Sequence, residues 1–141
     1  MNDQTLLHRQ VHPNFVENLS VSSQAFLTGQ MRAQSSIFAP SSKDENKLSV
    51  YNGEKFSPKE AFEHFIGEFN GKGVMSCGVL SVSKSECESV KPLTVLEDNE
   101  PFDGHAYIDY SQVGGTKKMK KSAATLRDFA IARGWQHFSE K

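Results

Sequence analysis

Residues 104–110 (GHAYIDY) limit the fold more than any other stretch, because polar and apolar side chains alternate along them. In a β-strand, successive side chains point to opposite faces of the sheet. The apolar members that would share one face are Ala106, Ile108 and Tyr110. The members that would share the other face are His105, Tyr107 and Asp109. The pattern predicts a strand whose two faces differ in chemistry.

Five further stretches have the alternation, the β-branched content or the apolar run of a strand. They are residues 6–11, 20–27, 47–51, 74–82 and 93–96. The third of these stretches runs into Asn52-Gly53, a dipeptide typical of tight turns. The fourth is mainly apolar, which predicts a central strand buried on both faces.

A capping box marks the start of a first helix over residues 57–69. In it, the Ser57 hydroxyl can accept from the third helical N–H while Glu60 reaches back, and Pro58 takes the first helical position. Apolar residues at spacings of three and four form one stripe, which we expect to face the core. The stripe consists of Phe62, Phe65, Ile66 and Phe69.

Two more helices follow. Ser83 and Glu86 form a second capping box and open a short helix that Pro92 must end. The longest helical pattern covers residues 116–133, and Gly134 is placed to terminate it. Its apolar stripe consists of Met119, Ala123, Leu126 and Ala130.

These elements favour an α+β fold over a strictly alternating parallel one, since hairpin-length turns join several of the strands. We predict a single domain in which a mixed or antiparallel sheet of about five or six strands carries the two longer helices. Residues 28–46 are the irregular part of the chain. Met31, Ile37 and Phe38 lie within it and predict that part of this loop packs against the domain.

Composition excludes several classes of protein. The 141 residues carry a net charge of −1, so bulk charge gives no argument for a nucleic-acid partner. No apolar run approaches the roughly 20 residues of a membrane-spanning helix, and the first residues lack the pattern of a secretory signal. We therefore expect a cytoplasmic protein without a membrane partner. Cys77 and Cys87 have no metal-ligand spacing, so we expect reduced thiols, no metal and no cofactor.

The polar face of strand 104–110 is the densest group of potentially reactive side chains. Its members stand about 7 Å apart along the strand, too far for a direct proton relay. They could line a site together with His8, Arg9 and His12, since imidazole accepts protons near neutral pH and guanidinium binds phosphate. The alternative is a half-solvated strand face whose histidine is satisfied by a hydrogen bond.

In this enzyme hypothesis the substrate is a nucleotide, NAD or an RNA phosphate, and His8 or His105 is the general acid or base. The remaining roles are phosphate binding by Arg9, Lys117 and Lys118, and orientation by Tyr107 and Asp109. The hypothesis requires that the strands of His8 and His105 be neighbours and face a common cavity.

Four lysines cluster in residues 117–121, where the longest helix begins. The positive end of the helix dipole opposes them there, so a further interaction is expected to favour them. A phosphate, a nucleic acid or an acidic partner would gain both the lysines and the helix N–H groups. The alternative is a solvated face beside the acidic loop 97–103.

Parts of the sequence resemble a group of small bacterial proteins that has no agreed activity, so no functional residue is carried over. The likeness rests on Ser22-Ser23-Gln24-Ala25-Phe26, Asp44, Leu48-Ser49-Val50-Tyr51, His105-Ala106-Tyr107-Ile108-Asp109 and Arg133-Gly134-Trp135. The opening His8-Arg9, followed by a serine-rich strand, is also similar to small ADP-ribosyltransferase-like proteins. The glutamate that many of those proteins use has no assigned counterpart here.

The sequence shows no metal cluster, no nucleotide-binding loop and no recognisable nucleophile with its base. Our first hypothesis is therefore a binding or accessory protein that acts through a partner protein. It would be one component of a bacterial multi-gene system of the toxin–antitoxin or defence type. The enzyme described above and a nucleic-acid-binding protein are the alternatives, and the sequence assigns no oligomeric state.

Overall fold

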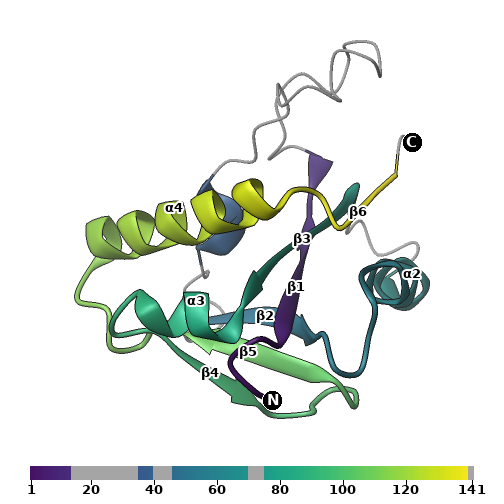
Figure 1. Cartoon of the computed structure of the whole chain (residues 1–141), viewed down its shortest axis with the longest axis horizontal. Helices are drawn as coiled ribbons and strands as arrows, with labels where there is room; N and C mark the ends of the chain where they lie inside the picture. Colours follow the sequence, from purple (N-terminus) through teal and green to yellow (C-terminus); the bar gives the residue numbers. More distant parts are fainter. Residues whose placement is uncertain (14–34, 40–45, 70–74, 140–141) are drawn as a thin grey trace.

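The computed structural model describes residues 1–13, 35–39, 46–69 and 75–139. Within them, six strands form one sheet in the order β4-β5-β2-β1-β3-β6, and every pairing is antiparallel. The strands are β1 (Leu6–Val11), β2 (Lys47–Asn52), β3 (Gly78–Ser83), β4 (Thr94–Glu97), β5 (His105–Asp109) and β6 (His137–Phe138). The helices are α2 (Pro58–Phe69), α3 (Lys84–Ser89), α4 (Thr116–Arg133) and the 3-10 helix η3 (Ser35–Phe38). The predicted α+β fold is confirmed (Figure 1), while the predicted strand 20–27 lies outside the described residues.

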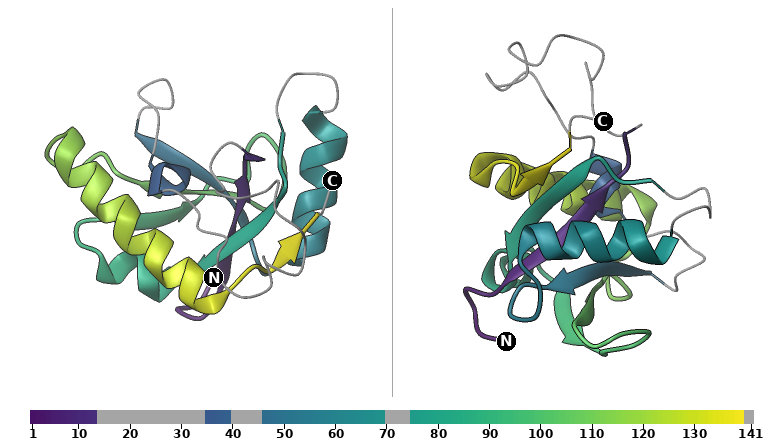
Figure 2. Two further views of the ribbon diagram at one scale, coloured as in Figure 1. Left: turned by 90° about the horizontal axis from the view of Figure 1, so that it is seen from above. Right: turned by 90° about the vertical axis from the view of Figure 1, so that its right-hand side faces the viewer.

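One face of the sheet is buried under α4, α3 and η3 (Figure 1). Seen from above, α4 runs across the sheet and α2 stands apart from it, next to β6 (Figure 2). The core between the sheet and the covering elements α4, α3 and η3 includes the nearly or fully buried side chains of Leu7, Phe38, Leu80, Ile108 and Leu126. The hydroxyl of Tyr110 donates a hydrogen bond to the carbonyl of Phe38, which ties η3 to the end of β5. The expectation that Ile37 and Phe38 pack against the domain is confirmed, and Met31 lies outside the described residues.

β5 has the two chemically different faces that its sequence predicts. Its inner residues, all buried, are Ala106, Ile108 and the adjoining Tyr110. Its outer residues, all half-buried, are His105, Tyr107 and Asp109. α2 covers the outer face at β1, β3 and β6 and reaches Tyr51 of β2 through His64. Among the described residues, no helix lies over the rest of the outer face on β2, β5 and β4 (Figure 1).

The predicted core-facing stripe of α2 requires a correction. Ala61 is the buried residue of this helix, and Ile66 is 40 % exposed. The small Ala61 side chain allows close approach, and the Ala61 carbonyl accepts a hydrogen bond of 2.9 Å from the Gln10 side chain on β1. The phenylalanines are only half-buried, and Phe62 stacks on His137 of β6 at 4.6 Å between ring centroids.

β3 is buried along its whole length, as predicted for a strand covered on both faces. It is not the central strand, however, since β2 and β1 occupy the middle of the sheet. Its outer neighbour β6 has only two residues, too few to leave a periodic signal in the sequence. Gly78 allows this pairing, because a Cβ atom there would lie 2.5 Å from the His137 carbonyl oxygen.

Both predicted capping boxes are formed. Ser57 and Glu60 exchange hydrogen bonds of 2.9 and 3.1 Å before α2, and Ser83 and Glu86 do so at 2.8 and 3.1 Å before α3. Gly134 ends α4 with a φ of 91°, a conformation that favours glycine. No helix in the described parts of the chain has both the length and the apolar character needed to cross a membrane.

Leu126 and Ile131 lie on the same helix, so they make a matched pair for testing this core. Leu126 is 0 % exposed, and we expect Leu126→Ala to lower the free energy of unfolding by about 2 to 5 kcal/mol. Ile131 is 39 % exposed, so Ile131→Ala should stay within about 0.5 kcal/mol of wild type. Chemical denaturation measures both values. Equal losses would contradict the assignment of the core-facing side of α4.

Candidate functional site

The sheet register places His8, Tyr51 and His105 in one row across β1, β2 and β5. Residues directly opposite each other on neighbouring strands point to the same face, so these three side chains share the outer face. β2 nevertheless lies between the two histidine strands and separates them by about 10 Å. The enzyme hypothesis required neighbouring strands, and this requirement is not met.

His8 is a buried histidine with both ring nitrogens hydrogen-bonded. Its Nε2 lies 3.0 Å from the Phe56 carbonyl oxygen and its Nδ1 lies 2.7 Å from the Ser81 hydroxyl. A carbonyl can only accept, which assigns the ring proton to Nε2 and makes the Ser81 hydroxyl the donor to Nδ1. Burial lowers the pKa of His8, so the ring is neutral near pH 7.

A serine that donates to a histidine is also the arrangement of a nucleophile and its base. Ser81 is 0 % exposed in the middle of β3, so no substrate reaches its hydroxyl. A hollow of 380 Å³ is lined by His8 together with the chain's first residues and the turn between β2 and α2. Neither Ser81 nor His105 lines it. The His8–Ser81 pair therefore holds β1, β3 and the start of α2 together.

Arg9 donates hydrogen bonds to two main-chain carbonyls, and its predicted role in holding phosphate stays a prediction. β1 and β2 pair only at Leu7 and His8, and beyond these residues the strands part. The Arg9 guanidinium bridges the gap, donating to the Ser49 carbonyl at 3.1 Å and to the Ile37 carbonyl at 3.0 Å. We assign Arg9 to the joint between the sheet and η3.

His105 is paired with Asp98, a carboxylate that sequence reasoning missed. The His105 Nδ1 lies 2.6 Å from Asp98 Oδ1 across the β4–β5 hairpin. Asp109, the predicted partner, instead accepts a hydrogen bond of 2.8 Å from the Ser111 amide. Glu97 pairs with Ala106, so the register itself points to Asp98. The signal was the acidic loop directly preceding a strand that begins with histidine.

Five aromatic rings gather around this pair and join α2 to the hairpin. The ring cluster consists of Tyr51, Phe56, His64, Phe102 and His105. The Tyr51 hydroxyl lies 2.9 Å from His64 Nδ1, and burial, with the charge of Glu68, raises the pKa of Tyr51. Phe102 contacts both imidazoles, at 4.4 Å from His64 and 5.4 Å from His105 between centroids. The rings of this cluster pack against one another and so fix α2 to the β4–β5 hairpin.

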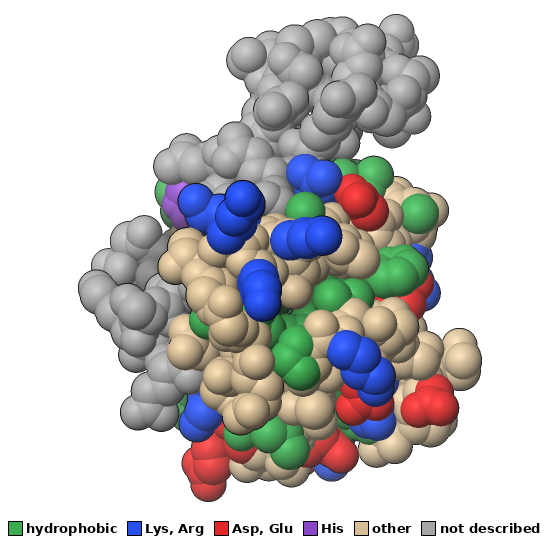
Figure 3. Space-filling model, turned by 90° about the vertical axis from the view of Figure 1, so that its left-hand side faces the viewer, with side chains coloured by type: hydrophobic (Ala, Val, Ile, Leu, Met, Phe, Trp, Pro, Cys, Tyr) green, Lys and Arg blue, Asp and Glu red, His purple; other side chains and the backbone are tan. Residues whose placement is uncertain are grey.

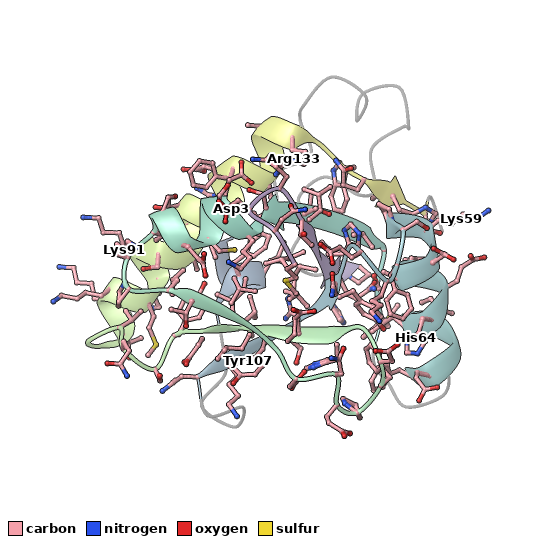
Figure 4. The ribbon with its side chains drawn as sticks, turned by 60° about the horizontal axis from the view of Figure 1, so that its bottom comes forward. Asp3, Lys59, His64, Lys91, Tyr107 and Arg133 are labelled. Carbon is pink, nitrogen blue, oxygen red and sulfur yellow. The ribbon has the colours of Figure 1, made fainter. Side chains whose placement is uncertain are left out.

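Tyr107 lies on the part of the outer face that no helix covers (Figure 4). Its cross-strand neighbours are Ser49 on β2 and Leu96 on β4, and Leu96 is 44 % exposed. The Lys47 ammonium lies over the Tyr107 ring, 5.0 Å from its centroid. The open face, defined by Lys47, Ser49, Leu96 and Tyr107, therefore combines an aromatic ring, a cation and exposed apolar surface.

One end of the sheet adjoins the start of α4 and gathers exposed lysines (Figure 3). The lysine end comprises Lys47, Lys91, Lys117, Lys118, Lys120 and Lys121. Asp109 at the end of β5 is directly opposite Lys47 on β2 and Thr94 on β4. Lys91 precedes Thr94 by three residues, so it lies at the same end of the sheet. Lys117 and Lys118 begin the helix that follows β5, whereas His8 and Arg9, with which they were predicted to act, lie on β1, and β2 separates β1 from β5.

The acidic loop 97–103 does not border the lysine end. The loop precedes β5 and α4 follows it, so the length of this strand, about 15 Å, separates them. The loop's charges have partners of their own. Lys55 pairs with Asp103 at 3.3 Å, and the ammonium of Met1 lies 3.4 Å from Glu97. The alternative that placed the lysines beside this loop is therefore wrong in that respect, while a solvated lysine face stays a prediction.

Both thiols are free and buried. Burial raises the pKa of Cys77 to about 11 and also raises that of Cys87, beside which Glu86 and Glu88 further disfavour a thiolate. Neither thiol is a good nucleophile at neutral pH. Among the described residues, no group of three His, Cys, Asp or Glu side chains is placed to hold a metal ion.

The neutral state of His8 predicts a pH dependence of stability. The pKa of His8 is lowered in the fold, so the unfolded chain takes up a proton near pH 6.5 before the folded chain does. His8 therefore weakens the fold as pH falls below about 6.5 and adds no pH dependence well above it. The stability difference between wild type and His8→Asn should shrink between about pH 7.5 and about pH 5.5. A ring pKa above 6.5, measured by NMR titration, would contradict this account.

Comparison with known proteins gives no match: no family model, no curated protein and no solved structure matches the chain. The two family resemblances drawn from the sequence stay predictions. The function therefore has to be argued from the surfaces described above.

Proposed function

We propose that this chain is a nucleic-acid-binding protein without catalytic activity of its own, and that the lysine end contacts the phosphates. The observation that carries the proposal is the gathering of six exposed lysines at one end of the sheet. They come from β2, from the turn before β4 and from α4. Asp109 is the sole carboxylate in residues 104–127, and it is engaged with the Ser111 amide.

The distribution of charge supports the proposal although the net charge is only −1. The carboxylates of the 97–103 loop lie at the other end of β5, where an ammonium, a lysine and a histidine pair with them. The lysine end keeps its positive potential, since Debye screening reaches only about 8 to 10 Å at physiological salt. Phosphates placed there release counterions, which drives binding.

The start of α4 favours an anion for a second reason. The helix has no acidic residue in its first turn, and its N-cap Gly115 supplies no side-chain acceptor. The positive end of the helix dipole and the lysines therefore both attract an anion at this place, where acidic side chains are the ones usually favoured. An acidic protein surface could bind the same lysines. The experiment below therefore compares binding of nucleic acid with binding of an acidic polypeptide. The hypotheses of a partner protein and of a multi-gene system stay predictions.

Lys117→Gln/Lys118→Gln tests the proposal through the salt dependence of binding to a labelled oligonucleotide. Each lost phosphate contact should flatten the log–log salt slope by about 0.7 on single strands or about 0.9 on duplex DNA. The double variant should therefore flatten the slope by roughly one to two units, with an unchanged melting temperature.

Lys55→Gln/Lys59→Gln is the matched control, since it removes the same charge near the start of α2. It should leave the slope as in wild type. Equal effects of the two double variants would contradict a localised site. Binding to poly-glutamate with no binding to nucleic acid would favour the acidic protein surface instead.

A further inference from the structure

We infer that the nucleic acid is single-stranded and that one of its bases stacks on Tyr107 in the open face of β2, β5 and β4. This inference rests on the proposed function and adds the ligand class and the residue that reads it. Proteins that bind single strands combine a basic track for the backbone with aromatic side chains on which bases stack. The open face and the lysine end provide these two elements side by side.

The surroundings of Tyr107 leave its ring accessible. Ser49, the neighbour on β2, is small and exposed, and Leu96, the neighbour on β4, is 44 % exposed. Viewed from the side of β4 and β5, no helix crosses in front of these strands (Figure 4). The exposed Leu96 side chain and the Tyr107 ring thus lie side by side on this part of the sheet.

The position of Lys47 shows which side of the ring is presented. Its ammonium occupies the ring face at 5.0 Å from the centroid, so a base that stacks on this face must take the place of the ammonium. A base that stacks there displaces the ammonium sideways and leaves it beside the adjoining phosphate. The Lys47 ammonium then binds a phosphate of the nucleic acid and exchanges its contact with the Tyr107 ring for an ion pair.

The open face continues directly into the lysine end. Lys47 belongs to both, and Asp109, opposite it, is two residues from Tyr107, or about 7 Å along β5. A strand with its base on Tyr107 can therefore pass its phosphates over the end of the sheet to α4. A duplex keeps its bases stacked on each other, so it offers Tyr107 no base face.

The test is fluorescence anisotropy with a labelled thymidine oligonucleotide of about 12 nucleotides, a length within the usual site sizes, and with a duplex of the same length. Wild type should bind the single strand more tightly. Tyr107→Ala should weaken that binding about 5- to 150-fold, since one stacked base contributes about 1 to 3 kcal/mol. Tyr107→Phe should stay within about twofold of wild type, because it keeps the ring. Tyr107→Leu keeps apolar bulk without a ring and should be weakened like the alanine variant.

The outcomes separate this inference from the proposed function. Equal affinity for duplex and single strand, with Tyr107→Leu unchanged and Lys117→Gln/Lys118→Gln weakened, would overturn the stacking site and leave nucleic-acid binding in place. Failure of wild type to bind either oligonucleotide at low salt would overturn both. A loss in Tyr107→Leu with retention in Tyr107→Phe, at matched melting temperatures, supports the inference.

Discussion

One-sided burial of the antiparallel sheet is the constraint on which the rest of this structure depends. β5 and β2 direct their apolar residues to one face, where α4, α3 and η3 cover them, and transfer of this surface from water provides the main driving force for folding. The other face is covered by α2 at β1, β3 and β6 and at Tyr51 of β2. The same alternation that builds the core therefore leaves Tyr107 and its neighbours on an open face. Core and candidate binding surface are the two sides of the same strands.

Local periodicity was sufficient to predict most of the elements, because each depends on the residues within it. The alternation of β5, the two capping boxes and the glycine that ends α4 all appear where the sequence placed them. The prediction that the apolar stripe of α2 faces the core was wrong, because periodicity alone does not show which side of a helix meets the sheet. Phe65 and Ile66 are apolar and correctly spaced, but the helix meets the sheet through Ala61, whose small side chain allows its carbonyl to reach Gln10. β6 was not predicted, because two residues are too few to show the alternation of polar and apolar side chains that marks a strand.

The site was less predictable, because its contacts join distant parts of the chain. The residue type of Arg9 suggests an anion, yet its partners are carbonyl groups exposed where β1 and β2 part, a feature of sheet register. His105 was correctly placed on the outer face, but its partner is Asp98 across the hairpin. The lysine run was recognised from the sequence, whereas its neighbours were not: Lys47 joins it from β2, and the acidic loop lies at the opposite end of β5. Charge segregation of this kind is invisible in a net charge of −1.

The most direct test of this account is an NMR titration of the isotope-labelled chain with a single-stranded oligonucleotide at low salt, followed through the backbone amide signals. The account predicts that the largest shift changes fall on Ser49 and Tyr107 of the open face and on residues 114–121 at the start of α4. Amides of α2 should change little, since this helix packs on β1, β3 and β6. Changes concentrated on α2, or no changes at any residue, would contradict the central claim that the open face and the lysine end form one binding surface.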